Sequence, residues 1–291
     1  MILIDFPNIA YMSVAIDSKT NEPDWKKSRA NILSQIKAAI SRYPDQPVIL
    51  CADRGSWRSS YFKFYKANRK KISADGVDWL AIASQMAKEF HTLGVHFPYI
   101  TMEVEGCEAD DIIAVLARRF TDRQVFIWSS DKDFRQLQSM PHVFQYSPRM
   151  RSTITELDSD KDLRMHIAKG DTVDGIPNIL TRDDIHVLPG VRSTVLSKKF
   201  MEAWMKSDRD FINLAYEAKD ISPSVSEARI ERNTTLIDLS RTPDDLVRQV
   251  NENFDAGVMT QNTSEKIHLY MLINNITTTN PKWLRAPTFH Y

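Results

Sequence analysis

The sequence lacks the features that mark several large classes of protein. Only two of its 291 residues are cysteines, Cys51 and Cys107, which excludes a disulfide scaffold and suits a reducing compartment. Glycine is scarce, at eight residues, and no Gly-x-Gly-x-x-Gly pattern occurs, so a nucleotide-binding Rossmann site is not indicated. No apolar run approaches the roughly 20 residues of a membrane-spanning helix, and the first residues do not form a signal peptide. We therefore expect a cytoplasmic protein with no membrane partner.

Net charge is absent as well, because 38 basic residues balance 38 acidic ones. This balance argues against a protein that simply coats nucleic acid. The charges are nevertheless segregated along the chain: residues 54–71 contain seven basic side chains and no acidic one, whereas acidic residues cluster at 108–111, 131–133 and 171–174. Opposite charges kept apart in this way predict a site that holds a polyanion next to bound cations.

The pattern of apolar residues predicts an α/β fold. Short β-branched runs at 2–5, 48–53, 99–104, 125–131 and 143–146 alternate with helical patterns near 26–42, 76–93 and 109–120. This alternation indicates a central, mostly parallel twisted sheet with helices on both faces. After about residue 150 the patterns are helical, near 158–169, 194–206, 208–217, 242–254 and 264–275, with breaks at prolines 177, 189, 223 and 243. We expect an α/β domain over 1–180 and a smaller, mainly helical region over 181–291.

Three of the predicted strands end in aspartate. Asp5, Asp53 and Asp131 each follow an apolar run, Asp133 comes two residues later, and Glu108-Ala-Asp110-Asp111 begins a predicted helix. Because ligands of open parallel sheets bind at the carboxyl ends of the strands, these side chains are expected to converge.

Each of these acids also has an ordinary structural explanation. A strand-end aspartate often caps the following helix, and acids in a first helical turn complement the helix dipole. In a regular helix Asp110 would point away from Glu108, so both can face one site only if they lie where loop turns into helix. Capping and the helix dipole explain each acid separately, but they do not explain why all of them should converge.

A cluster of so many carboxylates predicts bound cations. Two like charges about 4 Å apart repel by about 4 kcal/mol at an effective dielectric of about 20. Hard divalent cations relieve such repulsion through oxygen ligands, which favours Mg²⁺ or Mn²⁺; the sequence has no His-x-x-x-His or Cys-x-x-Cys pair for zinc. Paired ions of this kind occur in nucleases and polymerases. Asp171 and Asp174, three residues apart, are either further ligands or part of an ordinary acidic turn.

A basic and aromatic segment follows directly after Asp53. Between Trp57 and Lys71 five aromatic residues alternate with lysines and arginines. Aromatic rings can stack on unpaired bases while the cations contact phosphates. The alternative is an amphipathic helix whose rings enter the core beside a solvated basic face.

Together these motifs resemble the flap endonuclease/5′→3′ exonuclease family, and within it the phage ribonucleases H. The shared motifs, which follow the family's order over residues 1–180, are Ile-Asp5-Phe-x-x-Ile, Cys-x-Asp53, Tyr65-Lys66-x-Asn68-Arg69, Glu108-Ala-Asp110-Asp111, Ser-Ser-Asp131-x-Asp133-Phe and Lys-Gly-Asp171-x-x-Asp174. The family usually continues with a compact helix-hairpin-helix. Here that stretch is interrupted, with Leu188-Pro-Gly190 following Gly175-Ile-Pro177 only later, so a modified form is expected.

The resemblance implies a role for each matching residue. Two Mg²⁺ ions, replaceable by Mn²⁺, would be held by Asp5, Asp53, Glu108, Asp110, Asp111, Asp131, Asp133, Asp171 and Asp174. Lys66 and Arg58 would contact the scissile phosphate, within an arch near residues 57–78 that admits a single-stranded 5′ end. Nucleic acid would also contact Arg54, Trp57, Lys63, Tyr65, Arg69, Lys70, Arg192, Lys198 and Lys199. Residues 181–291 would bind duplex DNA.

The implied activity is hydrolysis of DNA, and of RNA in RNA–DNA hybrids, at a free 5′ end or flap. The resemblance further implies removal of RNA primers during phage lagging-strand synthesis, in the cytoplasm of the infected host and with a phage single-stranded DNA-binding protein as partner. Two alternatives remain. Asp131-Lys-Asp133 after a strand also resembles the nucleophile strand of small-molecule phosphohydrolases, and a catalytically silent protein could bind branched DNA.

Overall fold

The computed structural model describes residues 1–70, 77–155, 158–260, 266–277 and 280–290. The chain divides into two compact units. The sheet unit comprises residues 1–55, 72–155 and 243–291, and the helical unit comprises 56–71 and 156–242. Each unit is therefore assembled from separate stretches of the chain.

A six-stranded sheet in the order β3-β2-β1-β4-β5-β6 forms the centre of the sheet unit. Its strands are β1 (Ile2–Asp5), β2 (Val48–Cys51), β3 (Ile100–Met102), β4 (Val125–Trp128), β5 (Val143–Ser147) and β6 (Ser152–Ile154). The first five are parallel, and β6 pairs antiparallel with β5. All four residues of β1 are buried, as expected for a parallel strand covered on both faces. The predicted mostly parallel sheet is thus confirmed.

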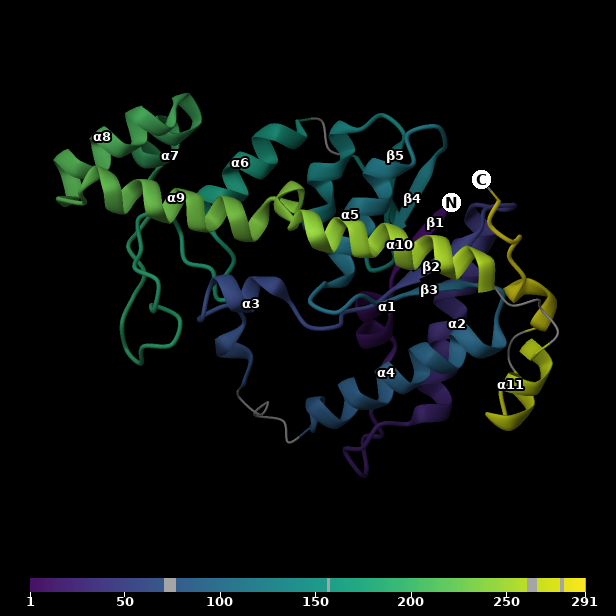
Figure 1. The fold of residues 1–291 in the computed structure, drawn as a ribbon. Coiled ribbons are helices and arrows are strands. Elements are labelled where there is room, and N and C mark those ends of the chain that lie inside the picture. Colours follow the sequence, from purple (N-terminus) through teal and green to yellow (C-terminus); the bar gives the residue numbers. More distant parts are fainter. Residues whose placement is uncertain (71–76, 156–157, 261–265, 278–279, 291) are drawn as a thin grey trace. The chain divides into compact units, whose positions relative to one another are not determined.

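Helices cover both faces of this sheet (Figure 1). One core cluster joins Ile2 and Ile4 of β1 to apolar residues of α1 (Phe6–Ser13), α2 (Trp25–Arg42), α4 (Trp79–His96) and α11 (Ile267–Ile273). On the other face α5 (Ala109–Arg119) contacts β1 and β2, and α10 (Asp244–Thr260) contacts α5 and β3. An ion pair of 2.7 Å between Arg119 and Asp255 joins these two helices. Short 3-10 helices η2 (Asp133–Ser139) and η5 (Pro281–Leu284) complete the unit.

The helical unit has its own core. It contains α3 (Trp57–Tyr61), η1 (Ala67–Lys70), α6 (Ser159–Lys169), α7 (Lys198–Lys206), α8 (Asp208–Lys219), α9 (Pro223–Ile237) and η3 (Leu239–Arg241). Trp204 and Phe211 are fully buried, and Phe62 and Tyr65 of the basic segment belong to the same cluster. A long stretch of turns and extended backbone, residues 170–197, joins α6 to α7, which pack against each other. No described helix of either unit is both long and apolar enough to cross a membrane.

The predicted boundary at residue 180 divides the chain by function, whereas the two units divide it by contacts. The predicted boundary separates a nuclease region, 1–180, from a duplex-binding region, 181–291. The functional boundary stays a prediction, and residues 243–291 belong structurally with the sheet.

Candidate metal centre

The strand order itself creates a place for a site. Strand β1 lies between β2 and β4: the chain runs from β1 through β2 to β3 on one side, and then crosses to β4 on the other side of β1. At such a switch point a crevice opens beyond the carboxyl ends of the strands. Asp5 is the last residue of β1, Asp53 follows β2, and Asp131 follows β4. The sheet therefore brings the three predicted strand-end acids to this crevice from three adjacent strands.

Asp5 is buried at the carboxyl end of β1. Its carboxylate caps α1 by accepting a hydrogen bond of 3.1 Å from the backbone N–H of Asn8, and it accepts another of 2.6 Å from the hydroxyl of Ser129. The pKa of Asp5 is raised from 3.8 to about 7, mainly by burial; the nearby carboxylates of Asp131 and Asp53 also raise it, and the hydrogen bonds from Ser129 and Asn8 lower it. The three acids are therefore close enough to repel one another when all are charged.

The start of α5 supplies the second group of acids. Glu108 is the N-cap residue and Asp110 lies in the first turn, so both stand where loop becomes helix, as the sequence required. Oxygen atoms of Glu108, Asp110 and Asp111 all lie within 4.8 Å of one another, and Glu108 and Asp111 are buried. Asp53 accepts a 2.8 Å hydrogen bond from the N–H of Ala109, which ties the end of β2 to this helix.

Helix capping explains part of this second group. Asp111 accepts a 3.0 Å hydrogen bond from the N–H of Glu108, and the N–H of Asp111 donates to Asp110 at 2.9 Å. The ordinary explanation considered for these acids therefore holds for Asp111. It also holds in part for Glu108, whose side chain completes the capping box by accepting from the backbone of Asp111.

Three neutral residues that the sequence did not single out hold the acids in place. Ser129 donates to Asp5 and also accepts from the N–H of Asp131 at 3.0 Å. The fully buried Gln145 donates its amide to the carbonyl oxygens of Ser129 and Asp131, at 3.1 and 2.6 Å. Asn8 accepts from the N–H of Ser130 at 3.1 Å. A polar residue between two aromatic residues of a strand, as Gln145 is between Phe144 and Tyr146, is the signal that the sequence offers.

The donor set of this crevice fits a hard divalent cation. Every side chain gathered from the predicted set offers carboxylate oxygens, the ligands that Mg²⁺ and Mn²⁺ prefer. The carboxylates of Asp131 and Asp53 contribute to the raised pKa of Asp5, after burial, so negative charge does gather around it. Asp133 lies beside Asp131, whose carboxylate accepts its N–H at 3.0 Å.

Asp171 and Asp174 belong to the helical unit, where they shape a turn. Asp171 accepts from the N–H groups of Val173 and Asp174, at 2.8 and 3.3 Å. The carboxylate of Asp174 forms an ion pair with Arg69 and accepts from the hydroxyl of Tyr65 at 3.3 Å. Their membership of the metal site stays a prediction.

The basic segment is attached to that turn along its length. The N–H of Lys66 donates to the carbonyl of Asp174 at 2.7 Å, and the amide of Asn68 donates to the carbonyl of Thr172 at 2.7 Å. Gly175 permits this close approach: it has a φ of +73°, and a Cβ there would lie 2.7 Å from the carbonyl oxygen of Phe64. The side chain of Lys66 rests over the Tyr65 ring, 5.0 Å from its centre.

The aromatic residues of the segment are only partly available for bases. Tyr65 is buried, and Phe62 is buried beside it, so the core-packing alternative holds for these two rings. Trp57 is half-buried. Arg58 is 1% exposed and donates from Nε to the carbonyl of Leu236 at 2.9 Å. This placement argues against the predicted contact of Arg58 with a scissile phosphate.

The remaining predicted contacts lie on the surface. Arg54 pairs with Glu103 and Glu105 of the sheet unit, at 3.2 and 2.8 Å. Lys63, Arg69, Arg192, Lys198 and Lys199 are exposed. The side chain of Lys70, and residues 71–76 of the predicted arch, lie outside the described residues.

Comparison with known proteins agrees with this geometry. Residues 1–165 match the family model of the 5′-3′ exonuclease, N-terminal resolvase-like domain. The chain is 30% identical to ribonuclease H of Enterobacteria phage T4 over 266 residues, which span 85% of this chain and 84% of that protein.

Solved structures of a bacteriophage T5 protein share the fold. Its flap endonuclease, in a pseudo-enzyme-product complex with DNA and metal ions, superimposes with a TM-score of 0.62 at 17% identity, over 88% of this chain and 98% of that one. The T5 5′-exonuclease with bound zinc gives a TM-score of 0.61 at 16% identity, over 88% and 99%. Both T5 structures hold metal ions, which are divalent zinc in the second.

Proposed function

This chain belongs to the 5′-3′ exonuclease family, as a metal-dependent 5′ nuclease of the flap endonuclease and ribonuclease H type, and from that premise we propose that it uses Mg²⁺ to hydrolyse DNA, and RNA in RNA–DNA hybrids, at free 5′ ends and flaps. The observation that carries the proposal is the meeting of Asp5, Asp53 and Asp131 at the switch point of the sheet, next to the acidic start of α5. The small-molecule phosphohydrolase is no longer needed to explain Asp131 and Asp133.

The acids of the sheet unit would hold two metal ions, with Mn²⁺ able to replace Mg²⁺. When bound, such ions stabilise the charge on the attacking and leaving oxygens of a phosphodiester. Ser129 and Asn8 fix the carboxylate of Asp5 by hydrogen bonds, so that its oxygens are oriented before any ion arrives. Gln145 does the same for the backbone that carries Asp131. Asp171 and Asp174 remain proposed outer ligands.

The basic segment would supply positive charge to the substrate phosphate. Tyr65, held by Asp174, places its ring under the ammonium of Lys66, so we propose that Tyr65 orients Lys66 instead of stacking on a base. Arg69 is held by the same carboxylate. A cation fixed before the reaction stabilises transition-state charge without the cost of reorganisation.

The similarity to the T4 ribonuclease H supports a finer role. We propose removal of RNA primers from the lagging strand during phage DNA replication, in the cytoplasm of the infected host. A phage single-stranded DNA-binding protein is the proposed partner, and residues 181–291 are proposed to contact duplex DNA through Arg192, Lys198 and Lys199.

A gel assay on labelled substrates tests the activity. The purified protein is incubated with a 5′-labelled flap, a 5′-overhang duplex and an RNA–DNA hybrid, each with Mg²⁺ or with EDTA. Short labelled 5′ products that appear only with Mg²⁺ are expected on all three. Cleavage of the DNA substrates alone would remove the hybrid from the proposal, and intact DNA with either Mg²⁺ or Mn²⁺ would favour a silent binder of branched DNA.

Replacing Asp131 by Asn separates catalysis from binding. The variant keeps the side-chain volume but removes one of the charges that hold a cation, so cleavage should fall below detection while flap binding in EDTA changes little. Binding is measured by gel shift. Turnover equal to the parent protein would overturn the metal assignment.

A further inference from the structure

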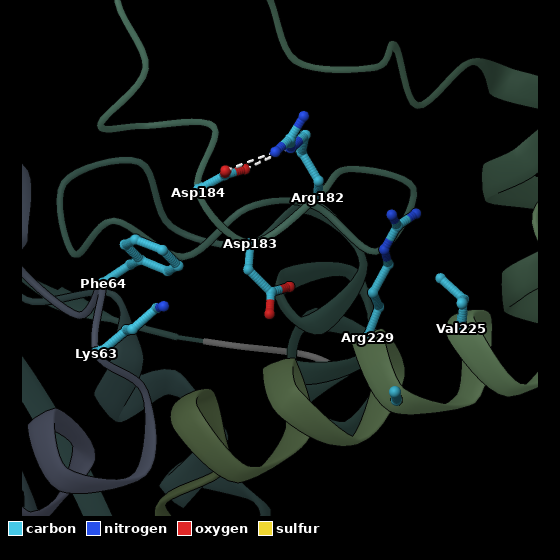
Figure 2. Close-up of a pocket in the computed structure, with 8 residues that line it drawn as sticks. Lys63, Phe64, Arg182, Asp183, Asp184, Val225 and Arg229 are labelled. Atoms are coloured by element: carbon cyan, nitrogen blue, oxygen red, sulfur yellow. Dashed lines mark hydrogen bonds and ion pairs between the residues drawn. The ribbon is translucent and has the colours of Figure 1, made fainter.

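Two places outside the metal centre gather basic side chains next to apolar ones. The first is a pocket of about 480 Å³ in the helical unit. Its cations are balanced within the pocket, because Arg182 pairs with Asp184 and the carboxylate of Asp183 lies between Lys63 and Arg229 (Figure 2). The second is the surface formed by the end of the chain in the sheet unit, where the charges are not balanced.

The last elements of the chain expose apolar side chains. One face of α11 packs into the core of the sheet unit, whereas the opposite face presents Leu269, Leu272 and Ile273 to solvent. In η5, which contacts α11, Trp283 is 51% exposed although the ammonium of Lys37 on α2 lies 3.6 Å from the centre of its ring. Single exposed apolar residues are common, but three on one face of a seven-residue helix, next to an element with an exposed tryptophan, indicate a binding surface.

The cations of this surface have no acidic partners. Lys37, Lys282 and Arg285 form no ion pair within the part of the chain that the structure describes. Their own segments supply no acid either, since neither α2 nor the chain after Glu265, itself outside the described residues, contains an aspartate or glutamate. The surface is therefore positively charged as well as apolar.

Acids of the neighbouring elements leave this excess of positive charge in place. Glu89, the acid of α4, is buried and forms an ion pair of 2.9 Å with Arg29. Asp122 pairs with Arg123 at 3.4 Å. Asp45, in the turn after α2, is exposed and offsets one positive charge at most.

This surface lies at the edge of the sheet opposite the metal centre. The carbonyl of Leu284 accepts a 2.7 Å hydrogen bond from the hydroxyl of Tyr99, which directly precedes β3. The carbonyl of His290 accepts one of 3.0 Å from Arg123, just before β4. The end of the chain therefore runs along the amino ends of the parallel strands, whereas the acids of the metal centre follow their carboxyl ends.

An acidic segment of a partner protein matches this surface better than nucleic acid does. A segment that presents acidic and apolar side chains together satisfies both properties of the surface, and complementary charge guides and orients such contacts. DNA offers phosphates but no aliphatic surface to cover Leu269, Leu272 and Ile273. A substrate bound at the amino edge of the sheet would also be held away from the acids that are proposed to bind metal.

We propose that the exposed surface of α11 and η5, together with Lys37 of α2, binds an acidic amphipathic segment of a partner protein. The apolar side chains of the segment pack on Leu272 and its neighbours, and its acids pair with Lys282 and Arg285. Because the surface and the metal centre lie at opposite edges of the sheet, the partner and the substrate can bind at the same time.

Peptide selection tests the chemistry of the partner. A display library of random peptides of about 15 residues, long enough for a short helix, is selected on the full chain and counter-selected on the double variant Lys282→Glu with Arg285→Glu. Thermal denaturation first confirms that this variant is folded, and Lys282→Glu alone replaces it if it is not. We expect the selected peptides to be enriched in Asp and Glu next to Leu, Ile or Phe. No enrichment, or enrichment of basic peptides, would overturn the proposal.

An apolar variant gives an independent test. One selected peptide is labelled with fluorescein and its binding is measured by fluorescence anisotropy. Leu272→Ser should bind it several-fold more weakly, because an apolar contact is lost. Lys219→Glu, which reverses an exposed lysine at the end of α8, is the control for charge and should bind within about twofold of the parent protein. Unchanged binding by Leu272→Ser, or an equal loss in the control, would contradict a site on α11.

A competition measurement distinguishes a protein partner from nucleic acid. In EDTA an unlabelled flap should change the affinity for the peptide by no more than about twofold, and the double variant should bind the flap within about twofold of the parent protein. Displacement of the peptide by the flap, or loss of flap binding in the double variant, would assign the surface to nucleic acid and overturn the proposal.

The inference does not rest on the proposed function. A parent protein that binds acidic peptides but cleaves no substrate would refute the nuclease proposal alone. A parent protein that cleaves the flap but selects no acidic peptide would refute this inference alone.

Discussion

Asp5 combines two tasks in one side chain. It caps α1 and it stands among the carboxylates of the candidate metal centre. The first task needs only an acceptor oxygen, which Asn also provides, whereas the second needs a charge. A single substitution can therefore separate them.

Asp5→Asn should change how the metal-free protein responds to pH. Burial, with help from Asp131 and Asp53, raises the pKa of Asp5 from 3.8 to about 7. The folded state thus binds the proton more tightly than the unfolded state, so the free energy of unfolding decreases as pH rises from about 4 to about 7. The difference between these two pKa values corresponds to as much as about 4 kcal/mol.

The variant has no ionisable group at position 5, so its free energy of unfolding does not decrease in this way as pH rises. In EDTA it should be more stable than the parent protein at about pH 8, and this difference should shrink toward pH 4. Chemical denaturation at several pH values measures both. If the free energies of unfolding of the two proteins differ by the same amount at every pH, Asp5 is not desolvated as described. Added Mg²⁺ should stabilise the parent protein more than the variant.

Lys66→Ala should slow cleavage without weakening metal binding. The lysine belongs to the helical unit and offers no carboxylate to a cation, so metal affinity, measured by titration calorimetry, should stay within about twofold. The rate on a flap substrate should fall by roughly a hundredfold, the usual effect of losing one fixed group that stabilises transition-state charge. Lys219→Ala is the matched control, and equal rates for both variants would contradict the role of Lys66.

Individual residues also mark the limits of what the sequence can predict. The strand-end acids are found because a strand followed by Asp is a local pattern. Ser129 and Gln145 escape notice as partners because their roles depend on neighbouring strands meeting. The family resemblance assigns Arg58 to the substrate, yet its side chain is buried and donates to the carbonyl of Leu236, far along the chain.

At the scale of elements, the turn at Gly175 determines how the basic segment is attached. Both its positive φ and the nearby carbonyl of Phe64 disfavour a side chain. Gly175→Ala should therefore destabilise the protein and loosen the segment that carries Lys66. Gly190 provides the control, since it has a φ of +74° but a Cβ at this position would meet no atom within 4 Å.

The two glycine variants distinguish the backbone strain of a positive φ from the contact with the carbonyl of Phe64. Gly190→Ala should cost about 1 kcal/mol for the backbone alone, and Gly175→Ala should cost at least about 2 kcal/mol more, because backbone must move. Thermal denaturation measures the difference, and the flap-cleavage rate should fall for Gly175→Ala only. Equal losses in the two variants would show that the Phe64 contact is unimportant.

Most elements can be predicted from periodicity, and the exceptions have clear causes. Helix α9 is not predicted because Pro223 resembles a break, whereas proline is well suited to the first turn of a helix, where its missing N–H is not needed. Strand β6 has three residues and no buried face, so it leaves no alternating pattern. Helix α1 begins directly at the end of β1, and its short length hides its period.

At the scale of the whole molecule, the contacts of the sheet extend to the end of the chain. Helix α10 packs on α5 and β3, and the Tyr270 and Leu284 side chains enter the same core as β1. Local patterns cannot reveal this, because the packing partners are more than a hundred residues apart. The sequence indicates helices after residue 240 but not that they belong to the sheet.

A fragment of residues 1–180 should therefore fail to fold stably. It would expose the apolar surface of α5 that α10 covers and would lack α9, which completes the helical unit. Circular dichroism and thermal denaturation of the fragment, compared with the full chain, provide the measurement. A cooperative transition near that of the full chain would support residue 180 as a true domain boundary.

The chain passes between the two units four times, after residues 55, 71, 155 and 242. On the ribosome the first four strands are made early, yet α10, which packs on α5 and β3, is made more than a hundred residues later. The sheet unit cannot be completed before the residues after 242 have been made, so its apolar strands must be kept from aggregating until then. Such a protein should depend on chaperones that hold unfinished chains.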